Sequence, residues 1–410
     1  MKITECRNCK SEELIEVLNL GNQPPSNSFI KPENVSDSEK RYPLVIVYCS
    51  KCSLIQLNFT VDPHEIFGEY VYVTSNTKPL AMHLKEMAKS LYDFSGLKTE
   101  ELVIDIGCND GTLLSGYPAG KVRLLGLEPS SVAEFALNNG IPVRNTFFNS
   151  QTAKDIVRDE GKAKIITATN VFAHVPDQDD FMKGIDIVLD EDGMFVIEVP
   201  HILDMLQDCL FDTIYHEHIF YFSLIALENL LDIRGFRIFN VEKFDSGPSG
   251  PPIRVFICKK GAKYESSTTV QKIKEEEIAY GLNNVDIYHQ FSNKVWEAKS
   301  QLLKMLEKLH NKGERIVGFG APAKGNTILN TFGLDRAWID FILEKNELKC
   351  DLVTPGTHVP IVNEDSFDTG PYKYALLLSW NIVDFLIKKS DFIKNGGKFI
   401  VPLPEPKILP

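Results

Sequence analysis

The sequence contains no apolar run that approaches the length of a bilayer-spanning helix, and its first residues lack the apolar stretch of a secretory leader. It also lacks a basic block, because 56 acidic residues outnumber 44 basic ones and give a formal net charge of −12. Proteins that coat nucleic acid or anionic lipid usually show the opposite balance. We therefore expect a cytoplasmic protein that binds neither nucleic acid nor membrane. For its assembly we expect a monomer or a weak homo-oligomer.

The sequence has no evenly spread cysteine framework of the kind that staples small secreted proteins. Four of its eight cysteines form two CxxC pairs, Cys6/Cys9 and Cys49/Cys52. Each pair suits a tight turn, and together they offer the four thiolates of a tetrahedral Zn²⁺ site. Four thiolates leave no open coordination position, so the expected role of the metal is structural. The alternative is a set of reduced cysteines that are close only in sequence.

The chain is longer than one hydrophobic core usually organises, so several domains are expected. Residues 1–75 are rich in turns and hold the cysteine pairs. In residues 76–262, short β-branched runs alternate with amphipathic stretches, which is typical of βαβ units and a mostly parallel sheet. Residues 263–410 open with a helical connector and continue with a second strand–glycine turn–helix pattern.

We therefore predict an α/β protein made of a small N-terminal zinc-binding module, a Rossmann-like domain and a second, C-terminal α/β Rossmann-like domain. The expected strands lie at residues 44–48, 102–106, 124–127, 165–168, 194–198, 315–320, 338–343 and 374–378, and one or two long helices are expected within 265–312.

In the first of these Rossmann-like domains, a glycine turn that starts at Asp105 and Gly107, directly after an expected strand, indicates a methyltransferase domain. Glu128 ends the next strand, where nucleoside-binding domains place a carboxylate against ribose hydroxyls. The turn lacks the full GxGxxG of pyrophosphate binders. It therefore favours the cationic, phosphate-free S-adenosylmethionine (SAM) over NAD. The predicted cofactor site consists of Asp105, Gly107, Asn109, Asp110, Glu128, Pro129 and Asn170.

Two further segments carry titratable side chains. His174 follows the strand at 165–168, and ligands bind at the carboxyl end of such a strand; a structural histidine is the alternative. Residues 211–218 end in Tyr-His-Glu-His (Tyr215 to His218). These side chains can move protons near neutral pH and stabilise an oxyanion. A capped, solvated turn and a metal site are the alternatives for this segment.

The last domain has a glycine turn from Gly318 to Thr327 that joins a strand to a helix. Backbone N–H groups at a helix N-terminus bind anions, and Lys324 adds a positive charge. The turn matches neither a full Walker A loop nor a full Rossmann fingerprint. We expect it to hold a phosphate-bearing ligand that is not hydrolysed, with a tight turn of small residues as the alternative.

These motifs, in this order and over essentially the whole chain, resemble the zinc-containing nucleotide-sugar C-methyltransferases, which build branched-chain deoxysugars such as tetronitrose. The CxxC pairs are common elsewhere, whereas the Tyr-His-Glu-His and Ala-Pro-Ala-Lys-Gly strings are specific. The resemblance rests on both CxxC pairs, Tyr70-Val71-Tyr72, residues 105–111, residues 170–176, Glu198-Val199-Pro200, residues 211–218, residues 320–327, Pro355-Gly356-Thr357-His358 and Ser379-Trp380-Asn381.

The resemblance implies SAM-dependent methylation of C3 of a nucleoside-diphosphate 4-keto-deoxysugar. A base would remove the acidic proton beside the ketone, and the carbanion would attack the methyl group in line. O- or N-methylation of a sugar nucleotide or another small metabolite, and a binding module without activity, are the alternatives. The implied catalytic residues are His218 or Tyr215 as the base, Glu217 toward a sugar hydroxyl, and His174 and Tyr72 in the pocket; the implied substrate-binding residues are Tyr70, His216, Arg254, Gly320, Lys324 and Asn326.

The chain departs from the family in one loop. The family commonly shows His-Gly-Gly-Ser-Leu-Arg before the strand that begins near Arg254, whereas this chain has Ser-Gly-Pro-Ser-Gly-Pro-Pro-Ile-Arg over residues 246–254. The arginine is retained, the histidine is missing, and the prolines stiffen the loop. The acceptor would therefore differ from the usual one if this loop faces the sugar. A smaller departure is Glu344, where an Asp is usual.

Overall fold

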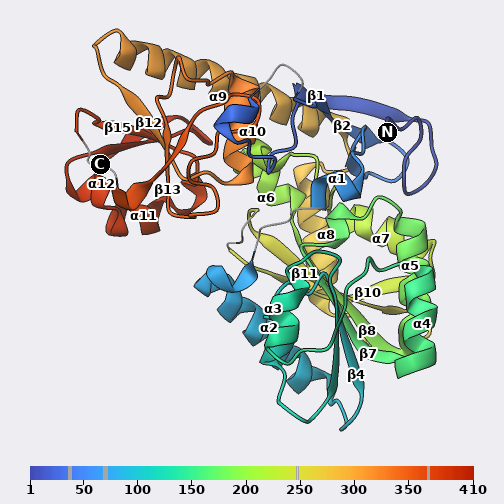
Figure 1. Ribbon diagram of the computed structural model, residues 1–410. Coiled ribbons are helices and arrows are strands. Elements are labelled where there is room, and N and C mark those ends of the chain that lie inside the picture. The colour runs from blue at the N-terminus through green and yellow to red at the C-terminus, as the bar shows by residue number, and fades with distance from the viewer. Residues whose placement is uncertain (36–38, 68–72, 246, 248, 367–369) are drawn as a thin grey trace.

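Three β-sheets organise the protein in a computed structural model that describes residues 1–35, 39–67, 73–245, 247, 249–366 and 370–410. In Figure 1 the C-terminal unit (orange to red) and the middle unit (teal to green) form two bodies, and the blue N-terminal strands lie near both. Within the described residues, no helix combines the length and apolarity needed to cross a bilayer.

The N-terminal sheet has four antiparallel strands: β1 (Leu14–Gln23), β2 (Tyr42–Cys49), β3 (Ile55–Leu57) and β9 (Phe220–Tyr221). The strand expected at 44–48 is confirmed as part of β2. Its alternate residues Leu44, Ile46 and Tyr48 are buried in a core that the sheet shares with the C-terminal unit. The fourth strand, β9, comes from the middle of the chain, so this module is completed by a distant segment. The helix of this region is α1 (Pro63–Phe67).

The middle sheet has seven strands in the order β10-β11-β8-β7-β4-β5-β6. The five strands from β4 to β8 run parallel, and β11 runs antiparallel to both of its neighbours. All four strands predicted in this region are confirmed. The strands are β4 (Leu102–Ile106), β5 (Arg123–Leu127), β6 (Val143–Arg144), β7 (Ala163–Thr169), β8 (Leu189–Pro200), β10 (Phe236–Lys243) and β11 (Pro252–Lys259).

Helices cover both faces of this sheet, as expected for a doubly wound fold. Residues of α2 and α3 pack into the core on one face, and residues of α4, α5, α7 and α8 pack into the core on the other. The helices are α2 (Lys78–Ser95), α3 (Ala133–Asn138), α4 (Ser150–Glu160), α5 (Gln178–Val188), α6 (Ile202–Gln207), α7 (Leu224–Asp232) and α8 (Thr268–Tyr280).

The C-terminal sheet has six strands in the order β14-β13-β12-β15-β16-β17, and all but β17 run parallel. This is the 3-2-1-4-5-6 order of a dinucleotide-binding fold, so the predicted second Rossmann-like unit is confirmed. Its strands are β12 (Ile316–Phe319), β13 (Ile342–Glu344), β14 (Ile361–Asn363), β15 (Tyr374–Leu377), β16 (Lys398–Val401) and β17 (Lys407–Leu409), and its helices are α10 (Ala323–Phe332), α11 (Val383–Lys389) and α12 (Asp391–Lys394).

One predicted strand was placed too early. Residues 338–343 were expected as a strand, but β13 begins only at Ile342. Asp335 holds a turn over the preceding residues, because its carboxylate accepts from the Ala337 N–H at 2.9 Å and its carbonyl accepts from the Trp338 N–H at 3.0 Å. Trp338 therefore does not belong to the strand. Its ring stacks on the ring of His310, with the centroids 5.5 Å apart.

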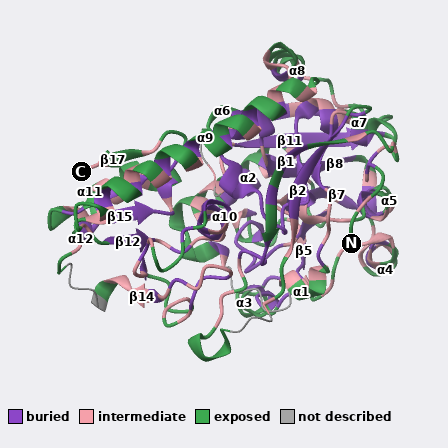
Figure 2. Cartoon of the chain, turned by 90° about the horizontal axis from the view of Figure 1, so that it is seen from above, coloured by how far each residue is buried: buried purple, intermediate pink, exposed green. Residues whose placement is uncertain are grey.

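The predicted helical connector is confirmed as α8 followed by α9 (Val285–His310). The buried residues of α9 recur every three or four positions from Tyr288 to Leu309, so one stripe of the helix faces the core shared by β1, β2 and the C-terminal unit. Figure 2 shows this division, with α9 exposed on its outer side and the strands of the sheets largely buried.

Both large sheets have a topological switch point, the place where the strand order reverses. It lies between β4 and β7 in the middle sheet and between β12 and β15 in the C-terminal sheet. Ligands of open α/β sheets bind in the crevice outside the carboxyl ends of the strands at this point. The fold therefore offers two candidate ligand sites.

Candidate active site

A cavity of about 1110 Å³ connects the two switch points. It is lined by the turns after β4 and β7, by the turns after β12 and β15, and by residues of the segment after β1. Typical small-molecule sites measure roughly 300–1,000 Å³. The cavity therefore has room for more than one small ligand, and one end of it lies in each α/β unit.

Six of the seven residues predicted for the cofactor line the cavity: Asp105, Gly107, Asn109, Glu128, Pro129 and Asn170. The seventh, Asp110, is not among the lining residues. Its carboxylate instead accepts from the Ser75 N–H at 2.9 Å and from the Thr112 hydroxyl at 2.6 Å. Asp110 therefore holds the segment that leads into α2 against the glycine turn.

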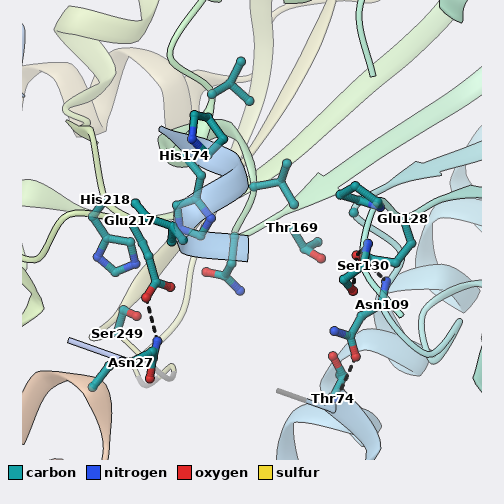
Figure 3. A pocket seen from close by; sticks show the side chains of 18 of the residues that line it. Asn27, Thr74, Asn109, Glu128, Ser130, Thr169, His174, Glu217, His218 and Ser249 are labelled. Carbon is teal, nitrogen blue, oxygen red and sulfur yellow. Dashed lines mark hydrogen bonds between the residues drawn. The ribbon is translucent and has the colours of Figure 1, made fainter. Parts of the chain in front are cut away.

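The backbone of the glycine turn explains its residue types. Gly107 has φ +69°, and a Cβ there would lie 2.4 Å from Cγ2 of Val171, so only glycine fits. Asn109 also has a positive φ, +52°, which asparagine tolerates better than most residues. Its side-chain oxygen accepts from the Thr74 N–H at 2.9 Å (Figure 3). The turn thus brings its backbone close to the cavity.

Two buried carboxylates lie at this end of the cavity. Glu128 is fixed by the Asn109 N–H at 3.0 Å and by the Ser130 hydroxyl at 2.6 Å (Figure 3). Asp105 accepts from the Thr167 hydroxyl at 2.6 Å, while burial and the nearby charge of Glu128 raise the pKa of Asp105 to about 7. A cationic ligand would offset the mutual repulsion of these carboxylates. The observed residues therefore fit SAM.

The segment 211–218 lies between α6 and β9 and reaches the cavity with four residues: Thr213, Tyr215, Glu217 and His218. His216, predicted as a substrate contact, is not among the lining residues. Its ring contacts Tyr42 edge-on at 6.0 Å, and burial lowers its pKa to about 4. His216 therefore packs against the N-terminal module.

His218 is poised to accept a proton. Its Nδ1 lies 2.7 Å from the Thr213 carbonyl oxygen, which can only accept, so Nδ1 carries the hydrogen and Nε2 keeps the lone pair. Burial lowers the pKa of His218 to about 4, which keeps the imidazole neutral. The ring of Tyr215 lies 4.1 Å from it, centroid to centroid.

His174 stacks on the His218 ring at 5.0 Å with the two planes 17° apart (Figure 3). Burial, together with the charge of His218, lowers the pKa of His174 well below its usual value. Two neutral imidazoles thus lie next to each other at the wall of the cavity, because a proton on either one opposes a proton on the other.

Tyr215 and Glu217 are both buried, and the pKa of each is raised above its usual value. Burial is the main cause of the raised pKa of Tyr215, whose side chain hydrogen-bonds with Ser249 of the loop that departs from the family pattern. Burial also raises the pKa of Glu217 to about 7, against the opposing effects of Asn27 and Lys349. Ser249 itself lines the cavity (Figure 3).

A buried network fixes the ends of this segment. Glu277 of α8 accepts from the Leu224 N–H at 2.6 Å, at the start of α7, and lies 2.8 Å from Nε2 of His201, just before α6. The other ring nitrogen of His201 lies 3.0 Å from Asp204. Since α6 precedes the segment and α7 follows it, this network limits how far the segment can move.

At the other end of the cavity, Lys324 lies in the first turn of α10 and lines the wall together with Ser379. Its Nζ lies 5.7 Å from the ring centroid of Trp380, and the indole of Trp380 donates to Asp212 at 2.7 Å. Burial lowers the pKa of Lys324, and the charge of the fully buried Asp212, in the segment 211–218, opposes that shift. The residues present suit an anionic group.

Gly320 and Asn326, also predicted for the substrate, are not among the lining residues. Gly320 has φ +79°, and a Cβ there would lie 2.3 Å from Oγ of Ser379, so it allows the turns after β12 and β15 to approach. Asn326 donates to the Ser26 carbonyl at 2.7 Å. Both residues therefore support the positions of lining segments and do not line the cavity themselves.

Sequence reasoning missed several lining residues, namely Asn27, Ser249, Asn346 and Lys349, and it noted Glu344 only as a departure from the family. Glu344 is the last residue of β13, and Glu128 comes directly after β5, so the position of Glu344 at the end of the second strand was the available signal. Asn27 lies in a turn-rich stretch that gave no such signal, because its partner Glu217 is 190 positions away.

Arg254, a predicted substrate contact, lies outside the cavity. It is buried, donates to Glu198 at 3.0 Å and to Glu242 at 3.2 Å, and stacks over the ring of Phe244 at 4.5 Å. These contacts occupy its guanidinium. Tyr70, a predicted substrate contact, and Tyr72, a predicted catalytic residue, lie outside the described residues.

The four predicted zinc ligands come together in the N-terminal module. The Sγ atoms of Cys6, Cys9, Cys49 and Cys52 all lie within 4.8 Å of one another. The Cys6–Cys52 and Cys9–Cys49 pairs are 3.7 and 3.5 Å apart. A tetrahedral site with Zn–S bonds of about 2.3 Å has edges of about 3.8 Å. The geometry therefore fits a closed, structural Zn²⁺ site, and none of these cysteines lines the cavity.

Family models match three parts of the chain. A putative zinc binding domain matches residues 6–67, a methyltransferase domain matches residues 81–241, and a C-methyltransferase C-terminal domain matches residues 248–404. C-methyltransferase NovU from Streptomyces niveus is 30% identical over 409 residues, which is 99% of this chain and 97% of that protein.

Solved structures resemble part of the chain. A SAM-dependent methyltransferase from Anabaena variabilis is 20% identical, with a TM-score of 0.34, and the match covers 43% of this chain and 84% of that one. Magnesium protoporphyrin IX methyltransferase from Synechocystis with bound SAM is 14% identical, with a TM-score of 0.32, and that match covers 48% of this chain and 89% of that one.

Proposed function

Because the chain belongs to the family of zinc-binding, SAM-dependent C-methyltransferases, we propose that it methylates C3 of a nucleoside-diphosphate 4-keto-deoxysugar. The family assignment answers the question of O-, N- or C-transfer in favour of carbon. One observation carries the choice of substrate: a single cavity joins an acidic pocket to a lysine-lined one, and a neutral imidazole lies at its wall.

SAM supplies, when bound, an electrophilic methyl group on a cationic sulfur. Asp105 and Glu128 match that charge, and the same carboxylates are suited to the amine and hydroxyl groups of such a ligand. Thr74, Asn109 and Asn170 would complete this end of the cavity. Binding in this place would direct the methyl group toward the segment 211–218.

In the proposed reaction, Nε2 of His218 removes the C3 proton of the sugar. The C–H electron pair becomes the C3–C4 double bond of an enolate, and the C4 oxygen takes the negative charge. Tyr215 is suited to donate to that oxygen, since its buried hydroxyl keeps its proton. Attack of C3 on the methyl group would form the new carbon–carbon bond, break the methyl–sulfur bond with its electron pair left on the sulfur of S-adenosylhomocysteine, and restore the C4 ketone. The proton would stay on His218 until the product leaves.

Lys324 and Lys349 are proposed to hold the nucleotide part. They are the only lysines or arginines among the described residues that line the cavity, and both belong to the C-terminal unit. The buried Nζ of Lys324 sits at the first turn of α10, where backbone N–H groups also favour an anion. A diphosphate there would place the sugar between Lys324 and His218.

The zinc thiolates bear on where the enzyme works. The paired cysteines are free rather than joined in disulfides, and metal-bound thiolates persist in reducing compartments. We therefore include a cytoplasmic location in the proposal. The expectation of a monomer or weak homo-oligomer is a separate part of it.

Solvent exchange tests this function most directly. The enzyme is incubated with a nucleoside-diphosphate 4-keto-6-deoxysugar in heavy water, and the C3 proton is followed by NMR with and without SAM. We expect exchange at C3 with the wild-type enzyme and none with His218→Asn. Methyl transfer to another acceptor, without exchange at C3 of several keto sugars, would contradict the proposed substrate.

A further inference from the structure

The zinc-binding module contributes one side chain to the proposed catalytic centre. Asn27, four residues after β1, donates from Nδ2 to Oε1 of Glu217 at 2.6 Å (Figure 3). Both side chains line the cavity. Within the described part of the chain, no other protein group donates a hydrogen bond to the Glu217 carboxylate. The second oxygen, Oε2, is therefore left for a ligand.

Asn27 is itself held firmly in place. On one side of it, the side chain of Gln23 donates to the Thr331 hydroxyl at 2.9 Å, and the Ser26 carbonyl accepts from Asn326 at 2.7 Å. On the other side, Ile30 and Val353 exchange two backbone hydrogen bonds of 3.1 and 2.8 Å. The segment is thus tied to the C-terminal unit before and after Asn27, which limits the freedom of its side-chain amide.

We infer that Asn27 is a positioning residue that keeps Glu217 ionised and turned so that Oε2 accepts a hydroxyl of the sugar. The inference rests on the proposed function for the identity of that hydroxyl. The contact between Asn27 and Glu217 does not depend on it. An amide N–H stabilises a carboxylate and has no comparable effect on the neutral acid, so the contact favours the charged form.

The surroundings of Glu217 make this assistance necessary. The carboxylate is 5% exposed and lies beside Tyr215, which also loses its proton reluctantly, and beside His218, which is neutral. The cation that faces it is Lys349, from the segment after β13. Burial raises the pKa of Glu217 to about 7, so a modest loss of stabilisation would leave it protonated under physiological conditions.

The first test compares pH profiles for Asn27→Ala and wild type. Loss of the donor should move the acidic limb of kcat/KM upward by about one pH unit and raise KM for the keto-sugar nucleotide about fivefold at pH 7, with recovery near pH 9. SAM affinity should change less than about twofold. Ser26→Ala is the matched control, since it alters the same segment and keeps the Ser26 carbonyl. Its profile should follow wild type.

A double-mutant cycle separates positioning from a merely structural role. If Asn27 acts through Glu217, Asn27→Ala should have little further effect on KM in a Glu217→Gln background. Asn27→Asp should be worse than Asn27→Ala, because a second carboxylate opposes the ionisation of Glu217. Equal effects of Asn27→Ala in both backgrounds would overturn the inference.

A measurement without substrate distinguishes failure of this inference from failure of the proposed function. Infrared spectra of the ligand-free protein, minus those of Glu217→Gln, report the protonation of this carboxyl group as the pH is varied. Its titration should shift upward in Asn27→Ala. A shift would support the role of Asn27 even if no keto-sugar nucleotide were methylated. An unchanged titration would overturn that role even if wild-type turnover were confirmed.

Discussion

The two α/β units use the same device at their switch points. In each, a carboxylate at the end of the second strand accepts a hydrogen bond from the glycine turn after the first strand. Glu128, after β5, accepts from the Asn109 N–H at 3.0 Å, and Glu344, in β13, accepts from the Ala321 N–H at 2.6 Å. Their difference lies in the charges around this shared device.

The middle unit adds a second carboxylate, Asp105, whereas the C-terminal unit adds two lysines, Lys324 and Lys349. Lys349 donates to the Ala321 carbonyl at 2.7 Å, so this side chain is hydrogen-bonded to the turn after β12. Under the proposed function, the same carboxylate contact would serve two ligands of opposite charge, and the side chains next to each turn would set which ligand fits. The comparison predicts that each end can be weakened without the other.

The largest effect is expected from the residue between the two ends. His218→Asn should lower methyl transfer by about 10³-fold or more, because the neutral base is lost. It should leave the affinities for SAM and for the nucleoside diphosphate within about twofold, since neither end is altered. Single-turnover kinetics and calorimetry on the same preparation check both parts. A large drop in either affinity would show that His218 also shapes a binding pocket.

Glu128→Ala should break the middle unit alone. It removes a fixed carboxylate and leaves the Asn109 N–H without its acceptor, so SAM affinity should fall about 10- to 100-fold. The affinity for a nucleoside diphosphate should be unchanged. Calorimetry with each ligand separately makes the measurement. Comparable losses for both ligands would mean that the two ends are mechanically coupled.

Lys324→Met should break the C-terminal unit in the converse way. It retains most of the side-chain volume and removes the charge. We expect about tenfold weaker binding of the nucleoside diphosphate, a shallower dependence of that binding on salt, and unchanged SAM affinity. Titrations at two salt concentrations test this. Lys349, which also lines the cavity, would be the principal cation if Lys324→Met had no effect.

The smallest expected effect is a pH dependence confined to the acidic end. The pKa of Asp105 is raised to about 7, mainly by burial, so Asp105 gains a proton as the pH falls below 7. The negative charge that attracts the cation is then lost, and SAM affinity should fall about tenfold between pH 8 and pH 6. Asp105→Asn should bind weakly with little dependence on pH over this range. An equal pH dependence in that variant would assign the titration to another group.

Much of this arrangement was predictable because it follows from local patterns. Buried β-branched runs indicated the positions of β4 and β7, and the spacing from Gly107 to Glu128 reflects one crossover between the parallel strands β4 and β5. The zinc ligands were predictable for a similar reason, since two knuckle turns carry recognisable spacing.

The contacts that were not predicted join residues far apart in sequence. Asn27 and Glu217 are brought together only by the docking of the N-terminal module, and no local pattern records that docking. Arg254 shows the opposite case. The family resemblance implied a substrate contact, but Glu198 lies directly across the strand pair β8/β11 and accepts hydrogen bonds from the guanidinium. Register between strands, which sequence spacing does not reveal, decided its partner.

The strand β9 has a consequence for how such proteins can be recombined. It closely follows the segment 211–218 and is hydrogen-bonded to β3, so a two-residue strand from the middle of the chain is an integral part of the zinc-binding sheet. A chimera that exchanged residues 1–75 between relatives would have to preserve the fit of β3 to a foreign β9. The C-terminal unit carries all six of its own strands. Exchange of the C-terminal unit between relatives should therefore disturb the sheets less than exchange of residues 1–75. New acceptor preferences would be easier to acquire in that way.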